Sequence, residues 1–238
     1  MRNIYKEYAN WKDVLMPQII KNLPKDPRGY PIPANVTWLN GKPIFKANDI
    51  VKENTMAENR QCSVTAVLMD RSTVRLITSP LNALGRPATV MDAPIHKDAL
   101  DYSMKVCPYM CLGQYYKGFQ KNFADKLNDK HDSEGVFFQN TSPVSTVPPF
   151  MIAIHPKHLQ AVEHGPTDRV YTVYPSDIIG LELYQYGDKI SFKEARPQLE
   201  EYLQVPEIAD RLASINRKPS EFLARFELYA KEYGKDRS

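Results

Sequence analysis

The stretch from Cys62 to Cys111 opens with QCSVT at residues 61–65 and closes with APIHKDA at 93–99 and VCPYMC at 106–111. All three cysteines of the chain lie within it. A structural zinc site takes four thiolate or imidazole ligands in a tetrahedral array, often as two close pairs. One chemically sensible Cys3His set is formed by Cys62, His96, Cys107 and Cys111. Zinc is therefore the one cofactor that the sequence suggests.

The same residues also have an explanation without metal. Thr65 stands three residues after Cys62, and Ala99 three after His96, where a pair-plus-pair pattern would have further ligands. Free cysteine is often a small buried hydrophobe, and a histidine before a helix can act as its cap. We therefore expect a vestigial site. Cys62, His96 and Cys107 should still lie near each other in space, with or without a metal.

Hydrophobic periodicity and turn signals predict an α+β fold. Asn40-Gly41 between two apolar runs predicts a β-hairpin over residues 36–45, because Asn-Gly is the strongest two-residue hairpin signal. Ser191 with Glu194 predicts a capping box for a helix reaching Leu203. The other expected helices cover 48–60 and 97–106 and begin near Pro206 and Pro219. Strands are expected at 62–69, 72–78, 151–154, 169–174 and 178–186.

A polar stretch from Asn128 to Pro149 is the expected boundary between two parts of the chain. The first, residues 1–127, contains the degenerate Cys/His core. The second, residues 150–238, is a small sheet followed by three helices. Alternatively, the two parts pack as one continuous body.

Composition limits the class of protein. The chain has 238 residues, a net charge of +3 and 42% hydrophobic residues, so it can form a sizeable core without metal or disulfides. The small net charge gives no whole-protein case for nucleic-acid binding. There is no apolar run of about 18 residues that would span a membrane and no signal-peptide pattern. Three cysteines do not make a disulfide framework, so the expected compartment is the cytoplasm.

Two segments are candidate binding sites. The proline-rich loop 23–33 contains a tight turn at Pro27-Arg28-Gly29, across which Asp26 is placed to pair with Arg28. This turn offers Arg28 and Tyr30 to a ligand, unless it is only a rigid surface turn. The basic-aromatic stretch 115–123 offers Tyr115, Lys117 and Lys121, which suit base stacking and phosphate contact. It reads equally well as a helix with an aromatic core face.

The order of these motifs resembles a group of small proteins encoded by phages, prophages and some bacteria. The resemblance is carried by LPKDPRGYPIP at 23–33, NGKP at 40–43, Cys62, PIH at 94–96 and CPY at 107–109. In that group, a Cys-x-x-Cys and a Pro-x-His-x-x-Cys follow the proline-rich segment, which implies a zinc-ribbon or treble-clef-like core. Thr65 and Ala99 replace the second and fourth ligands that the resemblance implies. It brings no activity with it.

Catalytic patterns such as Gly-x-Ser-x-Gly, a glycine-rich phosphate loop and His-Glu-x-x-His are absent from the sequence. We therefore expect a non-enzymatic binding or regulatory protein, phage-encoded, that acts on a host or phage protein in the host cytoplasm. One alternative is a nucleic-acid-binding protein that uses residues 115–123. A second is an enzyme with Cys107 as nucleophile and His96 as base. The sequence gives no indication of oligomeric state.

Overall fold

The computed structural model contains both helices and antiparallel sheets and describes residues 12–107, 110, 136–137, 148–163 and 169–234. The α+β class predicted from the sequence is confirmed. A five-stranded central sheet has the order β11 (Asp188–Ile190), β10 (Ile178–Gln185), β7 (Met151–Pro156), β3 (Val74–Thr78) and β5 (Ile95–His96). Every residue of β3 is buried, so this strand is covered on both faces of the sheet.

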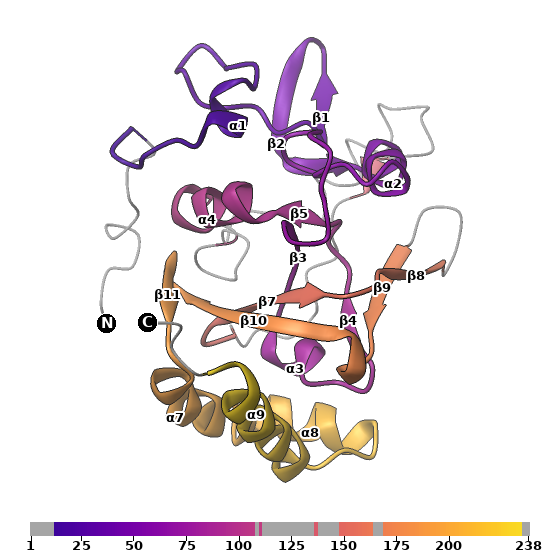
Figure 1. Cartoon of the computed structure of the whole chain (residues 1–238), viewed down its shortest axis with the longest axis vertical. Helices are drawn as coiled ribbons and strands as arrows, with labels where there is room; N and C mark the ends of the chain where they lie inside the picture. Colours follow the sequence, from indigo (N-terminus) through magenta and orange to yellow (C-terminus); the bar gives the residue numbers. More distant parts are fainter. Residues whose placement is uncertain (1–11, 108–109, 111–135, 138–147, 164–168, 235–238) are drawn as a thin grey trace.

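Alternation along the central strands separates two hydrophobic layers. In β7, Ile152 and Ile154 belong to one core cluster, whereas Ala153 between them belongs to the other. In β10, Leu183 and Tyr184 divide in the same way. This is the period of two that a strand imposes on its side chains. The sheet is thus the middle layer of the molecule, with helices above and below it (Figure 1).

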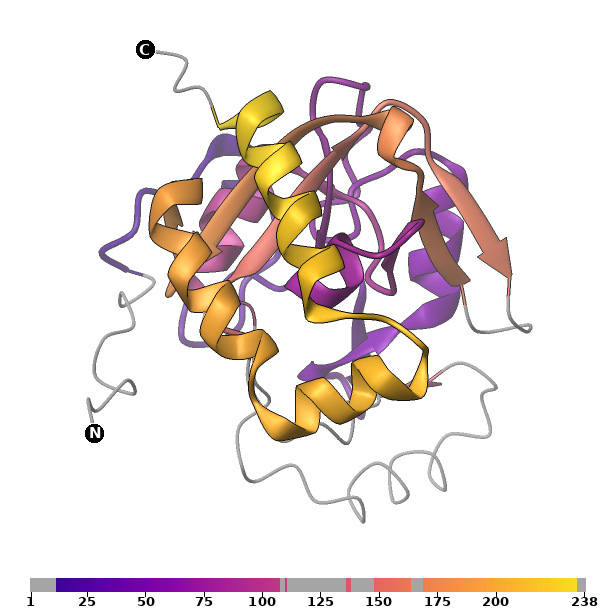
Figure 2. The ribbon, with the colours of Figure 1, turned by 90° about the horizontal axis from the view of Figure 1, so that it is seen from below.

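One face of the sheet carries the C-terminal helices α7 (Phe192–Leu203), α8 (Pro206–Ser214) and α9 (Pro219–Tyr233), together with the short α3 (Pro80–Ala83). Figure 2 shows them from below. The predicted capping box of Ser191 and Glu194 opens α7, which continues through Pro197. Prolines open α8 and α9, as predicted. Phe222, Phe226 and Tyr229 recur at helical spacing and are 1–5% exposed, so they anchor α9 to the core.

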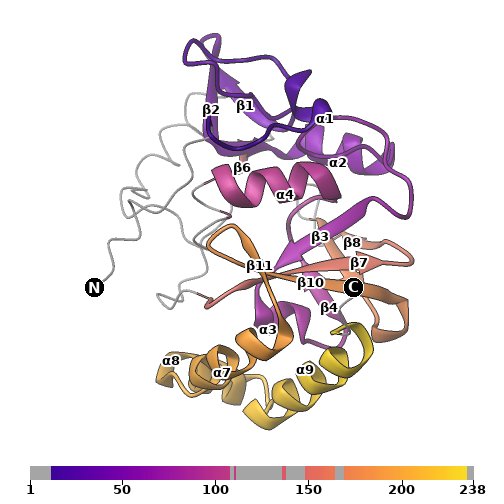
Figure 3. The same cartoon turned by 60° about the vertical axis from the view of Figure 1, so that its left-hand side comes forward.

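The other face carries α4 (Lys97–Val106) and, beyond it, the N-terminal elements (Figures 1 and 3). These are α1 (Gln18–Lys21), the hairpin of β1 (Val36–Leu39) and β2 (Lys42–Asp49), and α2 (Ile50–Glu58). The predicted hairpin is confirmed, because Asn40 and Gly41 form its turn with φ of +50° and +72°. β6 (Val136–Phe137) adds a third strand to this hairpin.

A third sheet has the order β4 (Ala88–Val90), β9 (Arg169–Val173) and β8 (Gln160–Glu163), and a 3-10 turn at Pro175–Asp177 leads from β9 into β10. Strands from both sides of the predicted 128–149 boundary pair with each other. β3 pairs with β7, and β4 pairs with β9. The N-terminal and C-terminal parts are therefore joined through two shared sheets.

The strand predicted at residues 62–69 is wrong. The segment turns back on itself, because the Cys62 amide donates to the Val67 carbonyl at 2.8 Å and the Ala66 amide donates to the Cys62 carbonyl at 2.8 Å. Ala66 takes a positive φ of 56° to make this turn. The valines at 64 and 67, which suggested a strand, instead pack against the core from a compact knuckle.

Candidate functional site

The Cys62 knuckle lies against the start of α4. The His96 amide donates to the Cys62 Sγ at 3.3 Å, and the His96 Nδ1 accepts from the Asp98 amide at 3.2 Å, which caps the helix. Cys62 is fully buried. The predicted proximity of Cys62 and His96 is therefore confirmed, although their contact is a hydrogen bond between backbone and sulfur.

The knuckle also contacts two other segments of the chain. The Ser63 amide donates to the Pro94 carbonyl at 3.0 Å, on the segment that leads into β5. The Ser63 and Val64 carbonyls accept from Asn35 at 3.1 Å and Ala34 at 2.8 Å, immediately before β1. The knuckle therefore ties the hairpin to the central sheet. We call this set of contacts the Cys62–His96 junction.

The donors at the junction do not fit a zinc site. Thr65 lies in the knuckle with a buried hydroxyl that has no hydrogen-bond partner among the described residues. Ala99 lies one helical turn after His96 and is fully buried. In the part of the chain that the structure describes, no three His, Cys, Asp or Glu side chains group as metal ligands would. Two donors are too few for structural zinc, which takes four.

The predicted four-ligand set is wrong on geometric grounds. His96 and Cys107 cap opposite ends of the ten-residue helix α4. A rise of about 1.5 Å per residue separates them by about 16 Å, whereas the ligand atoms of one zinc lie only about 2.0–2.3 Å from it. The same separation excludes Cys107 and His96 as a nucleophile–base pair. Cys111, Tyr115, Lys117 and Lys121 lie outside the described residues.

The proline-rich loop 23–33 is organised by one carboxylate. Asp26 accepts from the backbone amides of Arg28 and Tyr30, both at 2.9 Å. It also pairs with the Arg28 guanidinium at 2.6 Å, as the sequence predicted. The Asp26 amide in turn donates to the Tyr30 carbonyl at 2.9 Å, and Gly29 takes the positive φ of 84° that the turn requires. The loop therefore presents Arg28 in a fixed position, with its side chain 72% exposed.

Tyr30 connects this loop to the hairpin and to α4. Its hydroxyl lies 3.5 Å from the Val106 carbonyl, and its ring packs against the Phe45 ring in a T-shaped arrangement with centroids 5.3 Å apart. Burial raises the pKa of Tyr30 above its ordinary value. The Arg28 guanidinium lies over the Phe45 ring at 5.9 Å, a cation–π contact. Tyr30 is thus mainly an anchor, whereas Arg28 faces outward.

The hairpin contributes two aromatic residues that the sequence reasoning did not single out. Trp38 lies opposite Pro43, and Phe45 follows Pro43 by two residues, so strand alternation places all three on one face. Trp38 is 41% exposed and Phe45 36% exposed. The signal that could have identified them in the sequence was their position on the outward face of the predicted hairpin. We call Arg28, Tyr30, Trp38 and Phe45 the aromatic–arginine surface, and the loop lies beside the hairpin in Figure 1.

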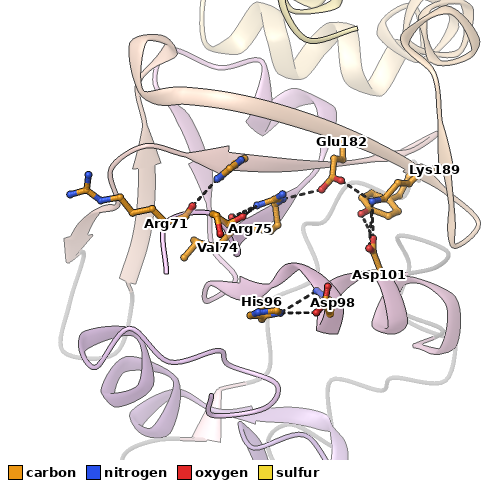
Figure 4. A network of polar contacts seen from close by, with 11 residues as sticks. Arg71, Val74, Arg75, His96, Asp98, Asp101, Glu182 and Lys189 are labelled. Carbon is orange, nitrogen blue, oxygen red and sulfur yellow. Dashed lines mark hydrogen bonds and ion pairs between the residues drawn. The ribbon is translucent and has the colours of Figure 1, made fainter. Parts of the chain in front are cut away.

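A polar network lies between the central sheet and α4 (Figure 4). Glu182 pairs with Arg75 at 3.0 Å and with Lys189 at 2.7 Å, and Lys189 also reaches Asp101 at 3.1 Å. The Tyr184 hydroxyl donates to Asp101 at 2.5 Å. Burial raises the pKa of Tyr184, as do the neighbouring carboxylates. The charged groups are paired with one another within the network, which is typical of a structural network. It stabilises the packing of β10 and β11 against α4.

A second buried polar pair lies between the hairpin and α2. The Asn35 amide nitrogen donates to the Glu53 carboxyl at 2.7 Å, and both residues are buried. Burial raises the pKa of Glu53 to about 7, although the hydrogen bond from Asn35 opposes the shift. The pair is a structural contact whose strength depends on pH.

The functional assignment of this chain rests on the geometry of its structure, because comparisons with known proteins found no match. No protein-family model, curated protein or solved structure matches this chain. Among the helices of the described residues, none has both the length and the apolar character that crossing a membrane requires.

Proposed function

We propose that this chain is a non-enzymatic binding protein whose aromatic–arginine surface contacts a partner protein. The observation that carries the proposal is the convergence of three outward-facing side chains on one rigid part of the fold. Arg28, Trp38 and Phe45 are 72%, 41% and 36% exposed, the first figure for its side chain alone. Tryptophan, tyrosine and arginine are the residue types most enriched among the energetic hot spots of protein interfaces.

The fixed geometry of this surface supports the proposal. Asp26 holds the Arg28 guanidinium through an ion pair and organises the loop through backbone hydrogen bonds. The Phe45 ring lies under Arg28 and against Tyr30. A preorganised surface loses little conformational entropy on binding, so more of the contact energy is available as affinity.

The same ion pair favours a protein partner over a nucleic acid. Nucleic-acid binding depends on cations that neutralise phosphates, and the charge of Arg28 is already matched by Asp26 at 2.6 Å. The remaining contact area of the surface is aromatic. The resemblance to phage-encoded proteins is compatible with a regulatory role on a host or phage protein, as expected from the sequence.

The test uses a photo-crosslinking amino acid at position 38 in the tagged full-length chain, expressed in the cells that naturally contain it. We expect a specific partner to crosslink from position 38 and not from position 228, because Leu228 is at least as exposed, at 53%, but lies on α9, outside the aromatic–arginine surface. The Trp38→Ser variant should bind the purified partner at least about 30-fold more weakly, because truncating a hot spot costs about 2 kcal/mol or more. Leu228→Ser is the matched control.

Two results would overturn the proposal. One is the absence of any partner crosslinked from position 38 at a stoichiometric level. The other is a purified partner that Trp38→Ser and Leu228→Ser bind equally well. Circular dichroism of both variants verifies that each is folded before its binding is compared.

A further inference from the structure

A hollow that opens to solvent lies in the C-terminal layer, between the end of α3 and the first turns of α9. Figures 1 and 3 show these two helices next to each other, across the central sheet from the hairpin. The hollow is lined by Leu84, Gly85, Arg86, Arg217, Glu221, Phe222 and Arg225. Three arginines against one glutamate leave this lining with a net charge of +2.

Arg225 is the central group of this lining. It is 8% exposed, and its Nη1 donates to the Leu84 carbonyl. Its buried Nε has no hydrogen-bond partner among the residues that the structure describes. Burial lowers the pKa of Arg225, and the nearby charges of Arg86 and Arg217 lower it further. A buried guanidinium donor without an acceptor is costly, so the Arg225 Nε favours a ligand that supplies the acceptor missing among the described residues.

Tyr229 provides a second unpaired donor one helical turn further along α9. It is 2% exposed, and its hydroxyl has no partner within the described part of the chain. Burial raises the pKa of Tyr229, and the charges of Arg225 and Arg86 oppose the shift. The Tyr229 hydroxyl therefore lies close enough to Arg225 and Arg86 for their charges to affect its pKa.

The backbone around the hollow is shaped to present these charges. Gly85 lies where a Cβ would come within 2.8 Å of the Pro87 carbonyl and 3.2 Å of the Asn82 carbonyl, so the bend that carries Arg86 needs glycine. Arg217 is held by Glu221 at 3.2 Å across the first turn of α9, with both side chains about 40% exposed. Glu221 compensates only one of the three positive charges.

We infer that this hollow, which we call the arginine hollow, binds a phosphoryl group, either as free phosphate or as the phosphate of a small ester. A phosphate dianion matches the net charge of +2 on the lining. Its tetrahedral oxygens accept the forked N–H donors of guanidinium groups, which pair with phosphate in bidentate fashion. The unpartnered Arg225 Nε is the donor that such a ligand would satisfy. This site is independent of the aromatic–arginine surface.

The experiment measures binding of sodium phosphate, phenyl phosphate and sodium acetate to the full-length chain at constant ionic strength, because screening would otherwise mask the comparison. Isothermal titration should give saturable phosphate binding with a dissociation constant of about 1 mM or lower. Acetate should bind at least about tenfold more weakly, because it has one negative charge. Tighter binding of phenyl phosphate identifies an ester as the ligand, and tighter binding of phosphate identifies the free ion.

Variants assign the binding to the arginine hollow. Arg86→Gln, at an exposed position, should weaken phosphate binding about tenfold or more, because it removes a charged donor. Arg211→Gln changes an exposed arginine of α8 that does not line the hollow and should leave binding unchanged. In NMR spectra, the Nε–Hε signal of Arg225, identified by its loss in Arg225→Lys, should shift on phosphate addition. Absence of saturable phosphate binding, equal affinity in Arg86→Gln and Arg211→Gln, or acetate binding as tight as phosphate overturns the inference.

Discussion

One buried carboxyl, Glu53, should make a large contribution to the pH dependence of stability. It is 6% exposed and accepts a hydrogen bond from Asn35 at 2.7 Å. Burial raises its pKa to about 7, from an ordinary value of 4.5, with contributions from the negative charges of Asp92 and Asp49. Between these two values the folded protein keeps a proton on Glu53 that the unfolded chain has already released.

The sign and size follow from this proton difference. Stability falls as pH rises wherever the folded state binds more protons than the unfolded state. Each pH unit is equivalent to about 1.4 kcal/mol for one proton. The contribution of Glu53 is fully present below pH 4.5, and about 3 kcal/mol of unfolding free energy is lost by pH 7.

The perturbation is Glu53→Gln, which keeps an oxygen that can accept from Asn35 and removes the ionisation. We expect its unfolding free energy to exceed that of the wild type by an amount that increases with pH and levels off near 3 kcal/mol above about pH 7. The assay is urea unfolding of both proteins at pH 5, 6, 7 and 8. Burial also raises the pKa of Asp92, to about 6. Both proteins contain Asp92, so comparing their unfolding free energies at the same pH reduces its contribution to the difference.

The matched control is Glu201→Gln, which removes an exposed carboxylate from α7. It should change stability by less than about 0.5 kcal/mol at every pH, as is usual for surface positions. If the difference between Glu53→Gln and the wild type were the same at pH 5 and pH 8, the pKa argument would be refuted. A variant less stable than the wild type at pH 8 would refute it as well.

Three further predictions concern packing and the junction. Glu182→Ala should lower the unfolding free energy by about 2–3 kcal/mol in urea titrations, because it leaves Arg75, whose side chain is 11% exposed, without its carboxylate; a loss below about 0.5 kcal/mol would contradict this. Phe226→Ala, at a 1% exposed position, should cost about 3–5 kcal/mol in the same assay, and a cost under about 1 kcal/mol would show that the helices do not depend on it. The double variant Thr65→Cys/Ala99→Cys adds two thiolates to the Cys62–His96 junction and should bind one zinc by elemental analysis, whereas either single variant should bind none; a metal-free double variant would disprove the arrangement.

Sequence reasoning succeeded where the signal was local. Asn40-Gly41 defines a hairpin through its own φ requirements, and Ser191 with Glu194 satisfies the amides of the helix that they begin. The strand predicted at 62–69 failed because its apolar residues pack from a turn, which alternation alone does not distinguish from a strand. Short strands such as β4 and β5 depend on pairing with distant segments, and β-propensity depends strongly on such context.

The candidate sites also differ in whether their residues are close together in the sequence. The Asp26–Arg28 pair was visible in the sequence because the two residues lie in one turn. The arginine hollow was not, because Arg86 and Arg225 come together only when α9 packs on the loop after α3. The error with Cys107 had a different cause. A helix predicted at 97–106 already places the residues that flank it, His96 and Cys107, about 16 Å apart, so the spacing itself argued against a shared metal.

The Cys62–His96 junction is held by packing and hydrogen bonds between protein groups. In an isolated finger, metal binding supplies about 10–16 kcal/mol of folding free energy. Here, the fully buried Cys62 and Ala99 belong to a core cluster that extends to the central sheet through Ala153. The Cys62 sulfur accepts the His96 amide, and hydrogen bonds from Ala34 and Asn35 hold the entry to β1. The junction therefore sets where the hairpin begins. On our proposal, its role is to position Trp38 and Phe45 for a partner.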